Sequence, residues 1–200
     1  MWTAILVAAG ILFVVFTTAG FYASRYKKVG PNQVLVISGR RRESTIINPV
    51  TGQKETVGFR VVKGGGSFIV PVLERVDILS MEILTIEVEV RSVYTVEGVP
   101  VHVDGVAQIK IRGEDVSIYT AAEQFLSKGP DGIVYVAHET LAGHLRGILG
   151  MLTVEESYKV RDAVALTVLE VSGSDLANVG LEIVSFVVKV IRVDKEYLES

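Results

Sequence analysis

Cysteine is absent from this chain of 200 residues. Its absence excludes disulfides, thiol catalysis, thiolate metal sites and S-palmitoylation, although it does not fix the redox compartment. Positive charge is not in excess either, because the formal net charge is −3 at pH 7. Binding to nucleic acid normally requires a basic patch. We therefore expect no nucleic-acid partner.

Known catalytic motifs are also missing. The sequence contains no G-x-S-x-G, no paired histidine and acid around a serine, and no D-x-D cluster. The stretch "KGGGS" at residues 63–67 lacks the spacing of a phosphate-binding loop. We therefore predict that the chain is not an enzyme and needs no cofactor, and a binding or assembly role is favoured.

The stretch "HETLAGHLR" at residues 138–146 suggests zinc at first sight. Zinc-binding helices of the H-E-x-x-H type place two histidines four residues apart, so that both rings share one face. Here Ala142 occupies the position of the second ligand, and His144 comes two residues later. Six residues turn a helix by about 600°, which leaves the two rings roughly 120° apart. We predict no metal site, and assign His144 to polar surface or to a subunit contact.

Charged side chains are absent from the first 24 residues. As a helix this stretch is about 36 Å long, enough for a hydrocarbon core of roughly 30 Å. We predict a transmembrane anchor over residues 1–24. A cleaved signal peptide is disfavoured because no basic region precedes the apolar run, and a re-entrant or interfacial helix is the third alternative. The predicted anchor residues are Trp2, Ile5, Leu6, Ile11, Leu12, Phe13, Phe16, Phe21 and Tyr22.

Basic residues follow the apolar run in two groups. By the positive-inside rule they place the body of a single-pass protein in the cytoplasm and its N-terminus outside. The second group stands at the entry of a polar segment and is a candidate contact for anionic lipid, with a solvated hairpin as the alternative. The first group is Arg25, Lys27 and Lys28, and the second is Arg40, Arg41 and Arg42.

Alternation of apolar and polar residues predicts a long β-hairpin with strands at Leu84–Val96 and Val99–Arg112. Two turn signals compete, Glu97-Gly98 and Asp104-Gly105, and propensity alone favours Asp-Gly. A turn at Asp104-Gly105 splits the apolar residues between the two faces, whereas a turn at Glu97-Gly98 places them all on one face.

The predicted register follows from a two-residue turn at Glu97-Gly98. It pairs Val88 with Ala107 on the apolar face and Arg91 with Asp104 on the polar face. Gly105 then lies inside the second strand, where we expect a bulge or a close contact.

The remaining segments predict an α+β fold. A strand is expected at residues 32–39 and a polar hairpin at 44–62 with its turn near 48–54. After a glycine turn, a further strand carries Pro71 at its edge or end. Helices are expected at 114–127 and 131–151. A longer helix begins at a Thr153–Glu156 capping box, and a final strand covers 181–193. The core face of the longer helix is expected to carry Val160, Val164, Val168 and Val171.

Four stretches closely resemble the flotillins, which belong to the stomatin–prohibitin–flotillin (SPFH, or Band 7) superfamily. They are "GPNQVLVISG", "VYTVEGVPVHVDGVAQIKI", "ETLAGHLRGILGMLTVEESYKVR" and "SDLANVGLEIVSFVVKVIRVDKEYL". The resemblance implies an N-terminal transmembrane helix followed by two SPFH subdomains, each with antiparallel sheet and packed helices. The expected subdomains are residues 25–83, with a polar insertion at 43–60, and residues 84–200, which lead into a coiled coil beyond this sequence.

The resemblance also implies a function. Flotillins are membrane scaffolds that form large homo-oligomers on the cytoplasmic face and organise raft-like lipid microdomains of the cell membrane. Animal flotillins are acylated, but this chain has Trp2 at position 2 and no cysteine, so the N-terminal helix is expected to replace the acyl anchor. The alternative is a regulatory subunit of a membrane protease or another membrane-protein complex, with NfeD-type membrane proteins as expected partners.

Overall fold

The computed structural model describes residues 2–39, 44–47, 54–70, 72–155 and 161–193. They form two compact units. The first unit comprises Met1–Ile46 and Lys54–Ile78, and the second comprises Ile47–Gln53 and Leu79–Ser200. Antiparallel strands and helices occur together, which confirms the predicted α+β class. The subdomain boundary that we placed between residues 83 and 84 stays a prediction.

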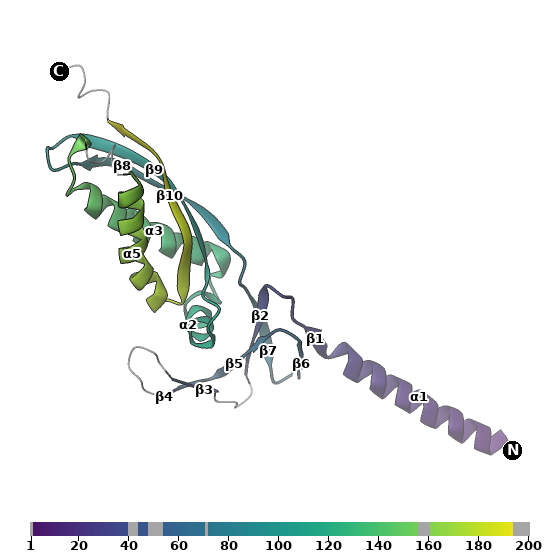
Figure 1. Cartoon of the computed structure of the whole chain (residues 1–200). Coiled ribbons are helices and arrows are strands. Elements are labelled where there is room, and N and C mark those ends of the chain that lie inside the picture. Colours follow the sequence, from purple (N-terminus) through teal and green to yellow (C-terminus); the bar gives the residue numbers. More distant parts are fainter. Residues whose placement is uncertain (1, 40–43, 48–53, 71, 156–160, 194–200) are drawn as a thin grey trace. The chain divides into compact units, whose positions relative to one another are not determined.

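The first unit begins with a helix, α1, over Trp2–Ser24 (Figure 1). Two of its threonine side chains bond to the helix's own backbone: Thr17 Oγ1 donates to Phe13 O at 2.9 Å, and Thr18 Oγ1 donates to Val14 O at 2.8 Å. Such bonds remove polar groups from an otherwise apolar surface. Among the residues that the structure describes, no helix is long and apolar enough to cross a membrane. The helix is therefore confirmed, whereas the predicted transmembrane span is not.

A three-stranded sheet forms the core of the first unit. Its central strand β2, Gln33–Ser38, lies between β5, Phe59–Lys63, and β7, Arg75–Ser80. Four consecutive residues of β2, Val34 to Ile37, are buried, as expected for a strand that is covered on both faces. The strand that we predicted at residues 32–39 is confirmed.

Two short strand pairs complete the first unit. Strand β1, Tyr26–Lys28, pairs with β6, Gly66–Phe68. Strand β3, Ser44–Ile47, pairs with β4, Lys54–Val57. The predicted polar hairpin is thus confirmed over these two strands, and its turn lies outside the described residues. Residues 59–62, which were predicted to belong to it, form part of β5 instead.

The second unit is a three-stranded antiparallel sheet with helices on one face (Figure 1). Strand β9, Pro100–Ile111, lies between β8, Leu84–Tyr94, and β10, Leu181–Val193. Every second side chain of β9 is buried, so one face of the sheet is apolar. The helices that cover this face are α2, Asp115–Phe125, α3, Gly129–Leu149, and α5, Arg161–Asn178.

The β8–β9 turn forms where we predicted it, but its loop has three residues rather than two. The Thr95 N–H donates to Val99 O at 3.0 Å, which leaves residues 96–98 as the loop. Gly98 has φ +75°, the left-handed conformation that a three-residue hairpin loop needs at its last position. The extra loop residue shifts the pairing by one position relative to our prediction.

A β-bulge in β8 adds a second shift of one residue. Arg91 and Ser92 together lie opposite His102, and Ser92 has φ +53° and donates its N–H to His102 Nδ1 at 3.2 Å. As a result Val88 pairs with Gly105 rather than with Ala107, and Asp104 pairs with Glu89 rather than with Arg91. Because the two shifts sum to an even number, the apolar side chains still share one face, as predicted.

The core face of α5 agrees with the predicted pattern except at one position. Val164 and Val168 are buried as predicted, but Val171 is 43% exposed. The buried face instead continues through Ser172 and Leu176 at steps of four residues, which follow the helical period more closely. Val160 and Glu156 lie outside the described residues.

Gly180 connects α5 to β10 where the chain passes close to α2. It has φ +81°. A Cβ at this position would overlap Ser117 O and lie 3.0 Å from Ala121 N. Both the conformation and the lack of space therefore require glycine.

We expect Gly180→Ala to destabilise the second unit by about 1–3 kcal/mol, because overpacking and a positive φ both act against the new methyl group. Gly143→Ala is the matched control. It lies on α3 with open space around its Cβ, and the higher helix propensity of alanine should stabilise the protein by up to about 1 kcal/mol. Urea unfolding followed by circular dichroism measures both changes. Equal stability of the Gly180→Ala variant and the wild type would contradict this account of the connection.

Candidate functional site

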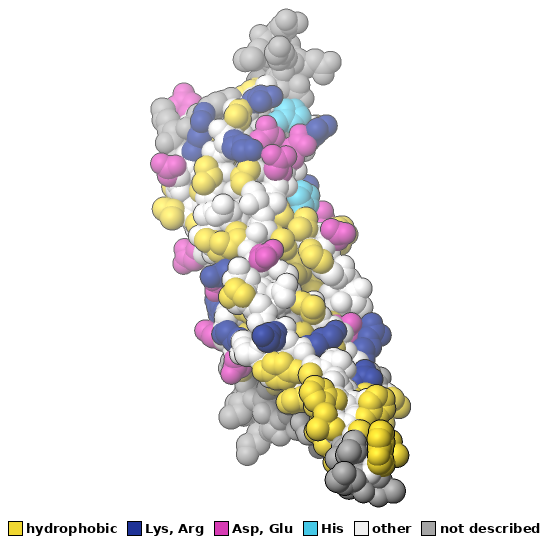
Figure 2. Space-filling view, turned by 90° about the vertical axis from the view of Figure 1, so that its right-hand side faces the viewer, with side chains coloured by type: hydrophobic (Ala, Val, Ile, Leu, Met, Phe, Trp, Pro, Cys, Tyr) yellow, Lys and Arg dark blue, Asp and Glu magenta, His cyan; other side chains and the backbone are white. Residues whose placement is uncertain are grey.

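The surface of α1 is apolar and exposed. Each predicted anchor residue with a described side chain is between 60% and 82% exposed. Figure 2 shows hydrophobic side chains gathered on this helix at the lower end of the view. An exposed apolar surface of this kind marks a contact with lipid or protein. The residues are Trp2, Leu6, Ile11, Leu12, Phe13, Phe16, Phe21 and Tyr22, and the side chain of Ile5 lies outside the described set.

Basic residues follow directly at the C-terminal end of α1. The Arg25 guanidinium lies 4.8 Å from the centroid of the Phe21 ring, in cation–π geometry. The Arg25 carbonyl accepts a hydrogen bond from the Ile69 N–H at 3.2 Å, which ties this end of the helix to the body of the first unit. Lys27 and Lys28 follow on β1 and are exposed. The second predicted basic group, Arg40–Arg42, lies outside the described residues.

A second exposed apolar surface in the first unit was missed by sequence reasoning. The Tyr26 and Phe68 rings lie 5.1 Å apart where β1 pairs with β6. The loop 69–74 follows β6 and exposes 88% of Val72 and 54% of Leu73. The apolar run at this point predicts a strand with Pro71 at its edge or end. The structure instead ends β6 at Phe68 and begins β7 at Arg75, and Pro71 itself lies outside the described residues.

A buried carboxylate holds the loop 69–74. Glu74 is only 7% exposed, and its Oε2 accepts the Val70 N–H at 3.0 Å. In the other direction, the N–H groups of Leu73 and Glu74 donate to Val70 O at 2.9 and 2.8 Å. These three bonds join Glu74 and Leu73 to the backbone of Val70. The turn is thereby fixed with Val72 and Leu73 on the outside.

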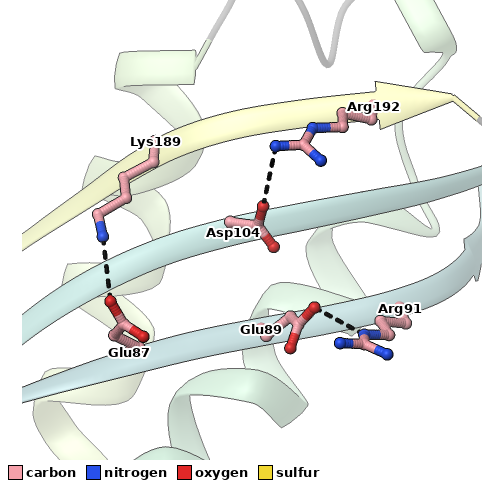
Figure 3. Close-up of polar contacts among 6 residues, drawn as sticks. All are labelled: Glu87, Glu89, Arg91, Asp104, Lys189 and Arg192. Carbon is pink, nitrogen blue, oxygen red and sulfur yellow. Dashed lines mark hydrogen bonds and ion pairs between the residues drawn. The ribbon is translucent and has the colours of Figure 1, made fainter.

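The outer face of the second unit, which is the sheet face away from the helices, is charged. Lys189 points toward Glu87, and Arg192 points toward Asp104 (Figure 3). The distance from Lys189 Nζ to Glu87 Oε1 is 3.3 Å, and that from Arg192 Nη2 to Asp104 Oδ2 is 3.9 Å. On β8 the Arg91 Nε donates to Glu89 Oε1 at 2.6 Å. This hydrogen bond lowers the pKa of the Glu89 carboxyl below its ordinary value. A hollow of about 510 Å³ lies along these strands, and all of these residues except Arg91 line it.

The two histidines of the stretch 138–146 make separate contacts. His144 Nε2 lies 2.8 Å from Asp175 Oδ2, which links α3 to α5, and His138 Nδ1 lies 3.1 Å from Glu139 Oε1. Within the described ranges, no three His, Asp or Glu side chains are placed to hold a metal ion together. The motif that suggested zinc thus supplies two separate surface pairs.

The model of the SPFH domain / Band 7 family matches residues 27–200. This chain belongs to the SPFH domain / Band 7 family. The predicted resemblance to flotillins is confirmed, since the chain is similar to several of them over most of its length. It is 39% identical over 196 residues to the flotillin-like protein FloT of Bacillus subtilis, which covers 98% of the chain and 38% of that protein.

Animal members of the SPFH family are similar as well. Flotillin-1 of Drosophila melanogaster is 41% identical and human flotillin-1 is 38% identical, each over 172 residues. Each match covers 86% of this chain and 37% of the relative. The chain thus spans less than two-fifths of the length of these relatives. The lipid contacts that we assigned to the anchor and to the basic residues stay predictions.

We expect Glu74→Ala to open the loop 69–74, because the partly buried Val70 N–H then loses its acceptor, at a cost of about 1–3 kcal/mol. Glu74→Gln retains a side-chain oxygen that can accept this bond and serves as the matched control. Hydrogen exchange at the Val70 amide should speed up in the alanine variant and stay near the wild-type rate in the glutamine variant. Unchanged protection in both variants would rule out a role for the Glu74 side chain in closing the loop.

Proposed function

We propose that this chain is the membrane-contacting part of an SPFH scaffold that homo-oligomerises and organises lipid microdomains without catalysing a reaction. The main support is the exposed apolar surface of α1 next to the basic residues Arg25, Lys27 and Lys28. Burial in lipid contributes about 1.5–3 kcal/mol for each large apolar side chain. A surface that is costly in water is therefore stable against a bilayer.

The apolar and basic residues of the first unit fit one lipid interface. We propose that α1 is embedded among the acyl chains and that Arg25, Lys27 and Lys28 lie at the headgroups. Anionic lipids give the cytoplasmic leaflet a negative surface potential, so the basic residues favour that side. The aromatic residues Phe21, Tyr22 and Tyr26 are of the type that is enriched at membrane–water interfaces. The exposed Val72 and Leu73 add a shallow contact in the same unit.

The scaffold role rests on repetition. One anchored copy contributes little order to a membrane, whereas many identical copies in a closed assembly hold the lipid beneath them together. Lipid and further copies of the chain are the partners that this role requires. Membrane proteins of the NfeD type stay an expectation from the flotillin resemblance.

The lipid contact of α1 predicts a loss of membrane binding when charge is introduced on its surface. Phe13→Asp combined with Phe16→Asp should greatly reduce flotation of the full chain with phospholipid vesicles, since each aspartate costs about 2.5–3.5 kcal/mol at the centre of an inserted helix. Leu166→Asp is the matched control, because this residue of α5 is also exposed and apolar. Flotation of the doubly charged variant at the wild-type level would refute the lipid contact of α1.

Particle mass and shape test the scaffold itself. The full chain, extracted together with its native lipid and imaged by electron microscopy, should form large closed homo-oligomers on lipid patches. Monomers, or a stoichiometric complex with a membrane protease, would exclude the self-assembling scaffold and favour the regulatory-subunit alternative.

A further inference from the structure

The two edge strands of the second unit's sheet carry opposite charges on the outer face. Edge strand β8 contributes Glu87 and Glu89, and edge strand β10 contributes Lys189 and Arg192 (Figure 3). The acid of β10, Glu182, lies at the beginning of the strand and is already bonded to Lys110 of the central strand at 2.8 Å. Strand β8 also carries Arg91, which is hydrogen-bonded to Glu89 of the same strand at 2.6 Å. Over this stretch the β8 edge (Glu87, Glu89 and Arg91) therefore keeps one negative charge in excess, whereas the β10 edge (Lys189 and Arg192) carries only positive charge.

The ion pairs on this face are open to further partners. Glu87 and Lys189 are 83% and 51% exposed at a separation of 3.3 Å, and Arg192 is 69% exposed at 3.9 Å from Asp104. An ammonium group has three donors, and a carboxylate has about four acceptor positions. Each group can thus bind a second group of opposite charge without losing its present partner.

We propose that a second copy of this chain docks beside the first, with the β10 edge of one copy against the β8 edge of the next. Lys189 and Arg192 of one copy then face Glu87 and Glu89 of its neighbour, and the hollow along these strands receives the neighbour's side chains. This contact rests on the proposed scaffold function, for which it supplies the lateral link between copies.

The charge pattern selects this arrangement over a symmetric dimer of edges. A twofold axis that places β10 against β10 brings Lys189 and Arg192 of both copies together, which is unfavourable. A twofold contact of β8 with β8 closes a pair of copies and allows no further growth through that edge. The head-to-tail contact brings opposite charges together and leaves both edges usable in every copy. It also keeps all copies in one orientation, as attachment to one membrane requires, and a rotation that closes produces a ring.

The contact is made by side chains rather than by a continuous ladder of backbone bonds. The pairing of β10 with β9 shifts at Val184 and at Lys189, and the pairing of β8 shifts at Ser92. Bulges and charges at edge strands prevent extension of the sheet from chain to chain. The association is therefore sensitive to salt, because ions screen exposed charges over a Debye length of about 8–10 Å.

Cross-linking of the cysteine-free chain tests the contact directly. Thr85→Cys on β8 and Val187→Cys on β10 are introduced into separate full-length copies with different tags, so all charges of the face stay in place. Both positions are exposed. The two variants are mixed in detergent, reconstituted into phosphatidylethanolamine–phosphatidylglycerol vesicles and treated with a short bismaleimide.

We expect covalent heterodimers from the mixture and about tenfold less product from either variant alone, since like edges do not meet. Gln108→Cys on the central strand β9 is the control for random collision, and it should give no product above that background. High salt added before cross-linking should lower the yield in the mixture.

Charge reversal provides a second, independent readout. Lys189→Glu with Arg192→Glu in the Val187→Cys copy should lower the heterodimer yield about tenfold. Glu87→Lys with Glu89→Lys in the Thr85→Cys copy should restore it. If the first charge reversal lowered the yield by misfolding the Val187→Cys copy, substitutions in the other copy could not restore the yield.

The failures of the two proposals are distinguishable. The edge contact is wrong if large particles form without Thr85–Val187 cross-links, or if charge reversal does not change the cross-linking yield. Neither result contradicts the proposed scaffold. A chain without cysteine substitutions that forms no large particles overturns the scaffold, and the edge contact with it.

Discussion

The second unit depends on the burial of alternate side chains along β9. This strand pairs on both sides, and its inward residues form the surface on which the helices pack. Gly105 lies at its centre, where a Cβ would be 3.1 Å from the Phe186 ring of β10. The aromatic ring fills the space left by the glycine, which keeps the middle of the strand covered. The outward residues of the same strand lie on the charged outer face of the sheet.

Much of this unit could be predicted from sequence because its signals are local and periodic. The alternation in β8 and β9 fixed the apolar face, and the final strand was predicted with the bounds that β10 has. The register was not predictable, since the three-residue loop and the bulge at Ser92 each depend on backbone conformations that several sequences adopt. Val171 was assigned to the core face of α5 because only apolar residues were counted in the helical period. The polar Ser172 takes this buried position instead.

The functional surface of the first unit was only half predictable. Absence of charge in residues 1–24 identified α1, and the adjacent basic residues were visible in the sequence. The exposed loop 69–74 could not be identified from the sequence, because an apolar run beside Pro71 is as typical of a strand as of an exposed turn. Only the position of Glu74, buried and bonded to Val70, distinguishes the two. The paired charges of the outer face were also missed, as they require the shifted register and the neighbouring β10.

The order of strands along the chain has a consequence for folding. β8 and β9 are joined by a short loop and can pair early, whereas β10 begins at Leu181, after all three helices. Closing the longer loop costs more entropy and slows the step. Until the helices pack against it, the apolar face of the hairpin is uncovered. The Glu97 carboxylate of the hairpin loop accepts the Val154 N–H at 3.3 Å, so the tip of the hairpin is secured only once α3 has formed. The newly made chain is therefore most vulnerable to aggregation between synthesis of β9 and arrival of α3.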